Sequence, residues 1–130
     1  MIHDRIDAVM QTEFLRLRPA TPIREAVAAL VENRTSAAPV IEDSGSLVGI
    51  LTQKDCFRSA LNASYYQQWS GKVADFMSRE ARTLEADADF VTAAEIFLDL
   101  PFRSFPVMHR GSVVGMLNRR DLLIGFLRLG

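Results

Sequence analysis

Two aspartates stand at matched positions in two similar stretches of the sequence. Asp55 lies in VGILTQKDCF, residues 48–57, and Asp121 lies in VVGMLNRRDLL, residues 113–123. Each is the third residue after a good helix-starting residue, Thr52 or Asn118. A carboxylate held at a helix start can accept two hydrogen bonds from a vicinal diol, and the same helix end tolerates phosphate. Ordinary capping is the alternative, because Thr or Asn followed three residues later by an acid approximates a capping box.

The two stretches belong to a repeat that covers most of the chain. A shift of 67 residues aligns RIDAVMQTE, residues 5–13, with KVADFMSRE, residues 72–80. After one deletion, a shift of 66 residues places Gly49 on Gly115 and so aligns the two aspartates. A copy of roughly 65 residues buries little surface alone. The two copies are therefore expected to pair about a pseudo-two-fold axis, as a homodimer would.

Each copy reads as strand, helix, strand, strand, helix. The first helix of each copy has apolar residues at the i, i+3, i+4, i+7 spacing of a buried face, namely Ile23, Ala26, Val27, Leu30 and Val31 in one copy and Phe90, Ala93, Ala94, Phe97 and Leu98 in the other. Thr21-Pro22 is expected to start the first of these helices, and Asp87 or Asp89 the second. A hairpin then leads to the helix that carries the aspartate.

Composition narrows the possible functions. The chain has 130 residues, of which 48% are hydrophobic and 24% charged, as is ordinary for a globular protein. The net charge is −1 and there is no basic tract, so the charge pattern does not indicate binding to nucleic acid or to an anionic membrane. The apolar runs are too short to span a bilayer, and the N-terminus has no signal-peptide core, so a cytoplasmic location is expected. The single cysteine, Cys56, excludes a multi-cysteine metal site and is expected to be buried rather than nucleophilic.

The pattern as a whole resembles a known family. Three segments are together similar to the CBS domain, namely KVADFMS at residues 72–78, FRSFPV at residues 102–107 and LVGILTQKD at residues 47–55. The tandem resembles a CBS pair, or Bateman module. The resemblance implies an α/β (α+β) fold in which two βαββα repeats pack through their sheets about the pseudo-two-fold axis. It divides the chain into a first repeat, a connector and a second repeat, at residues 1–62, 63–71 and 72–130.

The resemblance also implies two clefts for adenosine-containing ligands such as AMP, ADP, ATP or S-adenosylmethionine. In each cleft the aspartate would receive the ribose hydroxyls, and the other repeat would supply residues for adenine and phosphate. The first cleft would comprise Thr52, Asp55, Ala81, Arg82, Arg103 and Ser104. The second would comprise Phe14, Leu15, Ser36, Ala37, Asn118 and Asp121. The first is favoured, because the second has Asn in place of Thr and Ser36 in place of a base.

The expected function is a non-catalytic regulatory module. The chain offers no nucleophile with its base, no metal constellation and no phosphate-cradling glycine loop, so no catalytic residue, metal or required cofactor is predicted. The adenosine ligand would favour one orientation of the repeats, and a partner protein would read that change. The resemblance implies a homodimer, and the apolar C-terminal segment, residues 121–130, either extends its interface or forms a core helix.

Three interpretations stay open at this point. The chain is either a ligand sensor or a structural dimerisation scaffold whose clefts are vestigial. A small hydrolase acting through Asp55 or Asp121 is the third interpretation, and it is disfavoured because helix-start carboxylates make poor general bases.

Overall fold

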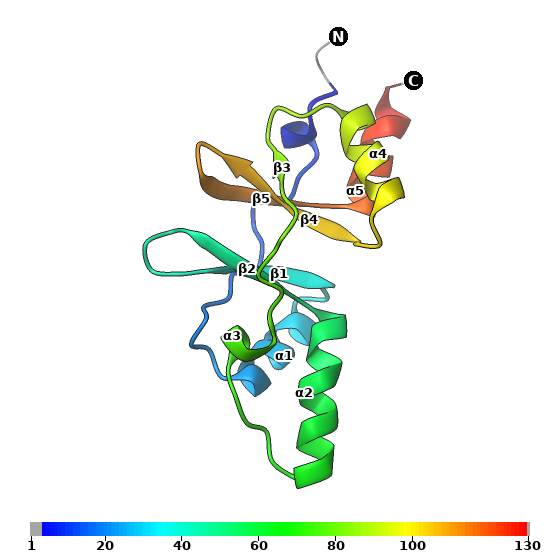
Figure 1. Ribbon diagram of the computed structural model, residues 1–130. Helices are drawn as coiled ribbons and strands as arrows, with labels where there is room; N and C mark the ends of the chain where they lie inside the picture. Colours follow the sequence, from blue (N-terminus) through cyan, green and yellow to red (C-terminus); the bar gives the residue numbers. More distant parts are fainter. Residues whose placement is uncertain (1–3, 130) are drawn as a thin grey trace. The chain divides into compact units, whose positions relative to one another are not determined.

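The computed structural model describes residues 4–129 and divides the chain into two compact units. One unit is the continuous stretch Leu15–Ala81, and the other combines Met1–Phe14 with Arg82–Gly130. The helices and strands of Figure 1 are, in chain order, η1 (Ile6–Ala8), α1 (Ile23–Glu32), β1 (Ala37–Ile41), β2 (Leu47–Thr52), α2 (Gln53–Tyr66), α3 (Val73–Phe76), β3 (Leu84–Glu85), α4 (Phe90–Asp99), β4 (Ser104–His109), β5 (Ser112–Asn118) and α5 (Arg119–Arg128). The mixed α/β fold is confirmed.

The unit Leu15–Ala81 is built on the antiparallel hairpin β1–β2, with α1, α2 and α3 on one face of it (Figure 1). Its core contains almost completely buried side chains from two helices and one strand, namely Ile23 and Leu30 of α1, Leu51 of β2 and Val73 of α3. The predicted apolar face of α1 therefore packs as its spacing indicates.

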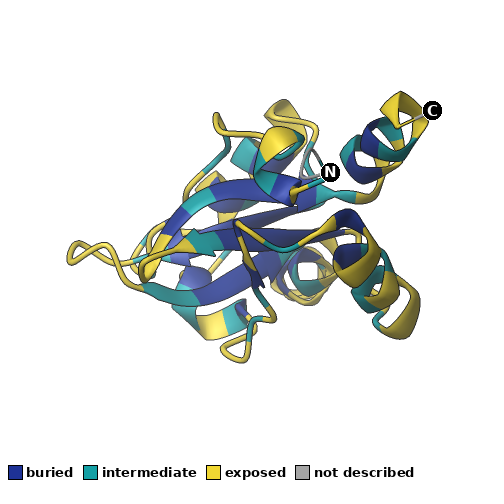
Figure 2. Cartoon of the chain, turned by 90° about the horizontal axis from the view of Figure 1, so that it is seen from above, coloured by how far each residue is buried: buried dark blue, intermediate teal, exposed yellow. Residues whose placement is uncertain are grey.

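The other unit is built on a three-stranded sheet in the order β3-β4-β5. β3 runs parallel to β4, and β4 runs antiparallel to β5. Phe90 of α4, Phe105 of β4, Leu117 of β5 and Ile6 of η1 fill its core. Figure 2 shows how burial follows these elements, with the strands mostly buried and exposed residues on the outer helical faces and in the turns.

Each repeat begins with a lead-in segment, residues 5–13 or residues 72–80, that packs in the unit built mainly from the other repeat. In one unit Gln11 and Met116 exchange two backbone hydrogen bonds, with N···O distances of 2.8 and 2.9 Å. In the other unit Ser78 and Ile50 exchange two such bonds, both of 2.9 Å. Each compact unit thus combines the lead-in segment of one repeat with the strands and helices of the other.

The repeated glycines make these close backbone approaches possible. A Cβ atom on Gly49 would lie 2.7 Å from the backbone oxygen of Ser78, and one on Gly115 would lie 2.9 Å from the backbone oxygen of Gln11. Both distances are shorter than van der Waals contact permits. The glycine of each repeated block is therefore explained by the lead-in segment that pairs beside it.

Two predictions of helix caps have clear outcomes. Asp89 caps α4, because its carboxylate accepts a hydrogen bond from Thr92 N at 2.7 Å, as one of the two alternatives predicted. Hydrogen bonds from the Thr92 backbone and side chain lower the pKa of the Asp89 carboxyl below its usual range. Thr21 does not cap α1: Pro22 is the N-cap residue, and the Thr21 carbonyl instead accepts a hydrogen bond from Val73 N.

The ends of the predicted apolar faces also differ from expectation. Val31 and Leu98 are exposed, not buried. Each stands one residue before the end of its helix, in the last turn, where the chain leaves the core. α2 continues to Tyr66, which lies within the segment predicted as the connector.

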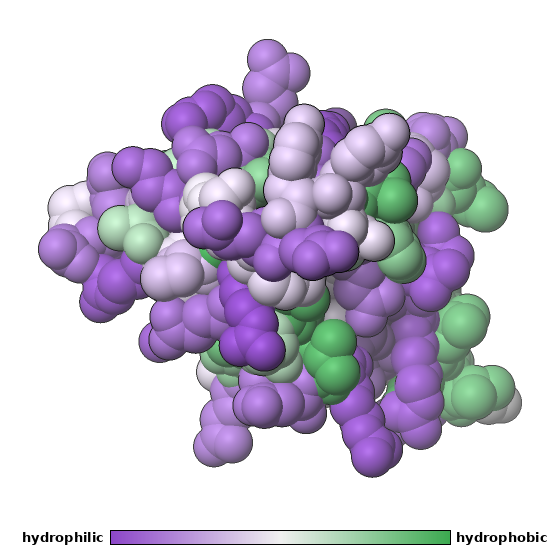
Figure 3. All heavy atoms as spheres, turned by 90° about the horizontal axis from the view of Figure 1, so that it is seen from below, coloured by the Kyte–Doolittle hydropathy of each residue, from purple (hydrophilic) through white to green (hydrophobic). Residues whose placement is uncertain are grey.

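The exterior is largely polar on the face seen in Figure 3, where hydrophilic side chains predominate and hydrophobic ones are scattered. Among residues 4–129, no helix combines the length and the apolar character that crossing a bilayer requires.

Candidate functional site

The N-terminus of α2 holds the first predicted aspartate in a complete capping box. Thr52 has an extended backbone and ends β2, and α2 begins at the next residue. The Thr52 Oγ1 atom accepts a hydrogen bond from Asp55 N at 3.1 Å. In return, the Asp55 Oδ2 atom accepts one from Thr52 N at 3.0 Å. The capping role proposed for this pair is therefore confirmed, and it fixes the carboxylate on the helix.

Capping leaves Asp55 with spare capacity to bind a ligand. An ionised carboxylate has about four acceptor positions, and the hydrogen bond from Thr52 N uses one of them. Asp55 is half-buried, so its carboxylate is held by the protein and still reached by solvent. This combination suits a group that must accept hydrogen bonds from an external donor.

The start of β1 lies directly beside this helix end. Ala37 is the strand partner of Thr52. Gln53 N donates to the Ser36 carbonyl at 2.9 Å, and the Gln53 Nε2 atom donates to the Thr35 carbonyl at 3.1 Å. The structure thus brings Ser36 and Ala37, which were predicted for the second cleft, next to the helix start that carries Asp55.

The N-terminus of α5 repeats this layout with one difference. Asn118 is the N-cap, and its Oδ1 atom accepts a hydrogen bond from Asp121 N at 2.8 Å. The Asp121 Oδ2 atom accepts from the Gln11 Nε2 atom at 3.0 Å. The capping box that α2 has is not formed at α5.

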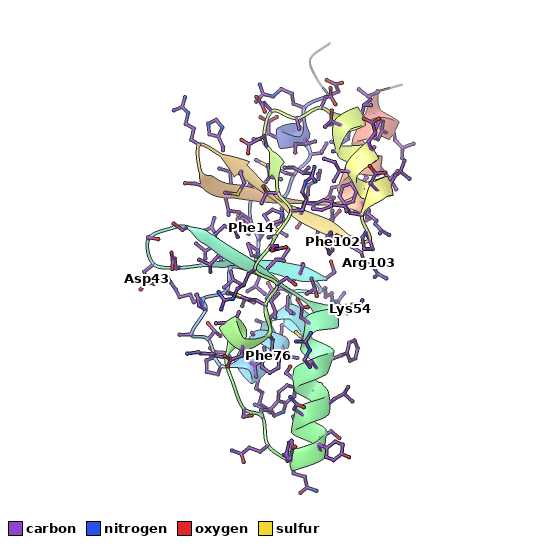
Figure 4. All side chains as sticks on the ribbon, in the orientation of Figure 1. Phe14, Asp43, Lys54, Phe76, Phe102 and Arg103 are labelled. Carbon is purple, nitrogen blue, oxygen red and sulfur yellow. The ribbon has the colours of Figure 1, made fainter. Side chains whose placement is uncertain are left out.

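Arg103 and Ser104 lie beside this second helix start. Ser104 is the strand partner of Asn118, and Arg119 N donates to the Arg103 carbonyl at 3.1 Å. Figure 4 labels Arg103 in the segment that enters β4, and Lys54 in the first turn of α2. The Ser104 Oγ atom is buried and has no hydrogen-bond partner among the described residues, which is a costly arrangement for a hydroxyl.

The predicted site residues divide between the two units. The unit Leu15–Ala81 contains Leu15, Ser36, Ala37, Thr52, Asp55 and Ala81. The other unit contains Phe14, Arg82, Arg103, Ser104, Asn118 and Asp121. Within its own unit, each aspartate sits where the repeat predicts it, at the third position of its helix. The grouping of residues from both repeats into two clefts stays a prediction.

Cys56 follows Asp55 and is buried in the core of its unit, as expected. Burial, with a further contribution from the Asp55 charge, raises the pKa of its thiol to about 11. The thiol is therefore protonated at neutral pH and unsuited to nucleophilic attack. Across residues 4–129, His, Cys, Asp and Glu side chains nowhere gather in a group of three or more that could hold a metal ion.

Gln11 is the residue of this site that the sequence analysis missed. The signal was present in the alignment of the two lead-in segments, where a long amide side chain at Gln11 matches the short Ser78. The alignment alone does not show that Gln11 pairs with Met116, and that pairing is what places Gln11 near Asp121.

Comparison with known proteins agrees with this architecture. The sequence model of the CBS domain matches the chain twice, over residues 6–62 and 73–127. The structure is similar to CBSX2 of Arabidopsis thaliana in complex with AMP, with a TM-score of 0.84, 24% identity and coverage of 96% of this chain and 97% of that one. It is also similar to the CBS domain pair of MJ0100 in complex with 5′-methylthioadenosine and S-adenosyl-L-methionine, with a TM-score of 0.79, 20% identity and coverage of 97% and 98%.

A curated relative shows how the same module occurs in larger proteins. The A-adding tRNA nucleotidyltransferase of Aquifex aeolicus is 30% identical over 119 residues, which are 92% of this chain and 14% of that enzyme. The chain therefore spans only a small part of this relative. Two matches of one family model cover most of the sequence, and the chain belongs to the CBS domain family as a tandem pair.

Proposed function

We propose that this CBS pair is a regulatory module that binds an adenosine-containing ligand through Asp55. The observation that carries the proposal is the Asp55 carboxylate, which the capping box holds in place while its remaining acceptor positions stay available. A ribose presents two adjacent hydroxyl donors, and charge-assisted hydrogen bonds to a fixed carboxylate are the stronger kind. The AMP complex of CBSX2 and the adenosyl ligands of the MJ0100 pair support this choice of ligand class.

The rest of the first site belongs to the same proposal. Thr52 lies beside the sugar and phosphate, and Ala81, Arg82, Arg103 and Ser104 complete the site. The guanidinium groups of Arg82 and Arg103 would neutralise the phosphate of a nucleotide. The second site, around Asn118 and Asp121, is the weaker one.

The proposed output is regulation rather than catalysis. A ligand with different affinities for two arrangements of the repeats shifts the population toward one of them, and a partner protein would respond to that shift. The buried, protonated Cys56 removes the one thiol of the chain as a nucleophile. AMP is accordingly expected to be recovered intact after prolonged incubation with the protein, as chromatography of the nucleotide would show.

Calorimetry and thermal melting with AMP test the proposal. AMP at 100 times its Kd is expected to stabilise the folded chain by about 2.7 kcal/mol, which raises the Tm by a few degrees in a protein of this size. Asp55→Asn should weaken AMP binding by about tenfold or more, because it replaces charge-assisted hydrogen bonds by neutral ones.

Asp75→Asn is the matched control. Asp75 accepts a hydrogen bond from Lys72 N at 2.9 Å and is the capping acid of α3, outside the proposed site. It should change stability while leaving the Kd for AMP unchanged. Equal loss of AMP binding in both variants, or no heat and no Tm shift with AMP or S-adenosylmethionine, would favour the structural scaffold.

We also propose that the module forms a homodimer through its exposed helical faces. Phe57 and Leu61 of α2 are each 67% exposed, and their repeat partners Leu123 and Leu127 of α5 are 63% and 80% exposed. The same two positions thus expose apolar side chains in both repeats, one turn apart on each helix. A matched apolar pair on both repeats suits a self-complementary interface with a second copy of the chain.

A further inference from the structure

The backbone of Gln11 is fixed close to the second site. Gln11 N donates to the Met116 carbonyl at 2.8 Å, and Met116 N donates to the Gln11 carbonyl at 2.9 Å. Gly115 permits this approach, since a Cβ atom there would lie 2.9 Å from the Gln11 oxygen. β5 ends two residues after Met116, at the N-cap Asn118. The Gln11 side chain therefore starts from a defined point beside the helix end that carries Asp121.

The Gln11 side chain uses this position to bind Asp121. Its Nε2 atom donates to the Asp121 Oδ2 atom at 3.0 Å. In the first repeat the corresponding carboxylate oxygen of Asp55 accepts from the N-cap backbone, Thr52 N, at 3.0 Å. The Asp121 carboxylate is thus engaged by a side chain from a remote part of the sequence, whereas the Asp55 carboxylate is engaged by its own helix turn.

The unit Leu15–Ala81 supplies an internal comparison. Ser78 occupies the position of Gln11 and pairs with Ile50 through two backbone hydrogen bonds of 2.9 Å, as Gln11 pairs with Met116. Gly49 stands beside it as Gly115 stands beside Gln11. The serine side chain has no amide donor and is two bonds shorter than glutamine. The backbone pairing is therefore the same in both units, and the side chain at the paired position differs.

We propose that Gln11 lowers the affinity of the second site for diol-bearing ligands by acting as an internal competitor for Asp121. A ligand that offers a vicinal diol competes with the Gln11 amide, which approaches the Asp121 carboxylate from outside its own helix turn, for the acceptor positions of that carboxylate. This inference rests on the proposed adenosine-binding function and explains why the two sites would differ in affinity. Gln11→Ser copies Ser78 of the unit Leu15–Ala81 and should raise the affinity of the second site.

The test is calorimetric titration with AMP of full-length variants in which Asp55→Ala removes binding at the first site. In Asp55→Ala protein, adding Gln11→Ser should tighten AMP binding by about threefold to tenfold, since one hydrogen bond to a charged group no longer has to be displaced. Adding Asp121→Ala as well should abolish that binding. Gln68→Ser is the control, because it removes an exposed glutamine side chain of the connector. Melting curves without AMP verify that each variant is folded.

The outcomes separate this inference from the proposed function. Tighter binding that requires Asp121 supports the inference. Unchanged binding in the Gln11→Ser variant overturns it, and weaker binding overturns it too, because Gln11 would then be a ligand contact. If wild-type protein binds AMP through Asp55 under these conditions, the proposed function survives either of those results. If neither wild-type protein nor any Gln11 variant binds AMP, both proposals fall together.

Discussion

At the scale of single residues, Asp55 and Asp121 show how one position in a repeat acquires two environments. Both carboxylates occupy the third position of a helix, after Thr52 or Asn118. The first completes a capping box, and the second accepts a hydrogen bond from Gln11 instead. The two repeats therefore share the helix start that holds the aspartate, whereas the group that donates to its carboxylate differs, Thr52 N in one case and the Gln11 side chain in the other.

Cys56 provides a residue-scale prediction that depends on pH. Its thiol pKa of about 11 leaves roughly one thiol in a thousand ionised at pH 8. Because the thiolate is the reactive form, iodoacetamide should alkylate Cys56 in the folded protein at least about a hundredfold more slowly than in the chain unfolded by guanidinium. Mass spectrometry at timed intervals measures both rates. Similar rates in the two states would show that Cys56 is neither buried nor shifted.

At the scale of elements, the pairing between lead-in segments and strands organises both units. β2 pairs through Ile50 with Ser78, and β5 pairs through Met116 with Gln11. Each pairing needs a glycine next to it, Gly49 or Gly115. The glycine in the repeated block thus has a structural cause that is independent of any ligand.

Gly115→Ala is expected to destabilise the protein by about 1–3 kcal/mol through overpacking. The new Cβ would lie 2.6 Å from Met10 Sδ and 2.9 Å from the Gln11 oxygen, and the backbone oxygen has little freedom to move. Chemical denaturation measures the free energy of unfolding. Ser112→Ala, at the exposed start of β5, is the control and should change that free energy by less than about 0.5 kcal/mol. A neutral Gly115→Ala variant would contradict the observed strand pairing.

Periodicity in the sequence predicted the elements well where local rules decide the outcome. The buried faces of α1 and α4 and the Asp89 cap follow from side-chain spacing and capping chemistry. Thr21 was wrong as a cap because its segment pairs with the remote segment that enters α3, through Pro22 with Lys72 and the Thr21 carbonyl with Val73 N, so α1 begins after Pro22. No local rule contains that partner. Gln11 was missed for the same physical reason, since its contact with Asp121 joins residues 110 positions apart.

At the scale of the whole molecule, the boundaries of the compact units do not coincide with those of the sequence repeats. The unit Leu15–Ala81 is continuous, whereas the other is assembled from Met1–Phe14 and Arg82–Gly130. Self-similarity locates the repeats but carries no information about which sheet each lead-in segment joins. That choice depends on long-range strand pairing, which sequence periodicity does not encode.

The proposed homodimer is a whole-molecule prediction. Light scattering coupled to size-exclusion chromatography is expected to give twice the chain mass of 14.5 kDa for the wild-type protein. Leu61→Glu and Leu127→Glu each place a charge in one exposed apolar pair, and they should shift the mass toward 14.5 kDa. Asn62→Glu adds the same charge at an exposed polar position of α2, off the face of Phe57 and Leu61, and should leave the mass unchanged. A monomeric wild-type protein at the same concentration would refute the interface.

A crystal structure of the protein grown with AMP would show whether Asp55 holds the ribose. We expect the ribose 2′ and 3′ oxygens to lie within about 3.2 Å of the Asp55 carboxylate oxygens, with the Thr52–Asp55 capping box intact. Nucleotide bound at Asp121 and absent from Asp55, or bound elsewhere with Asp55 facing only solvent, would contradict it.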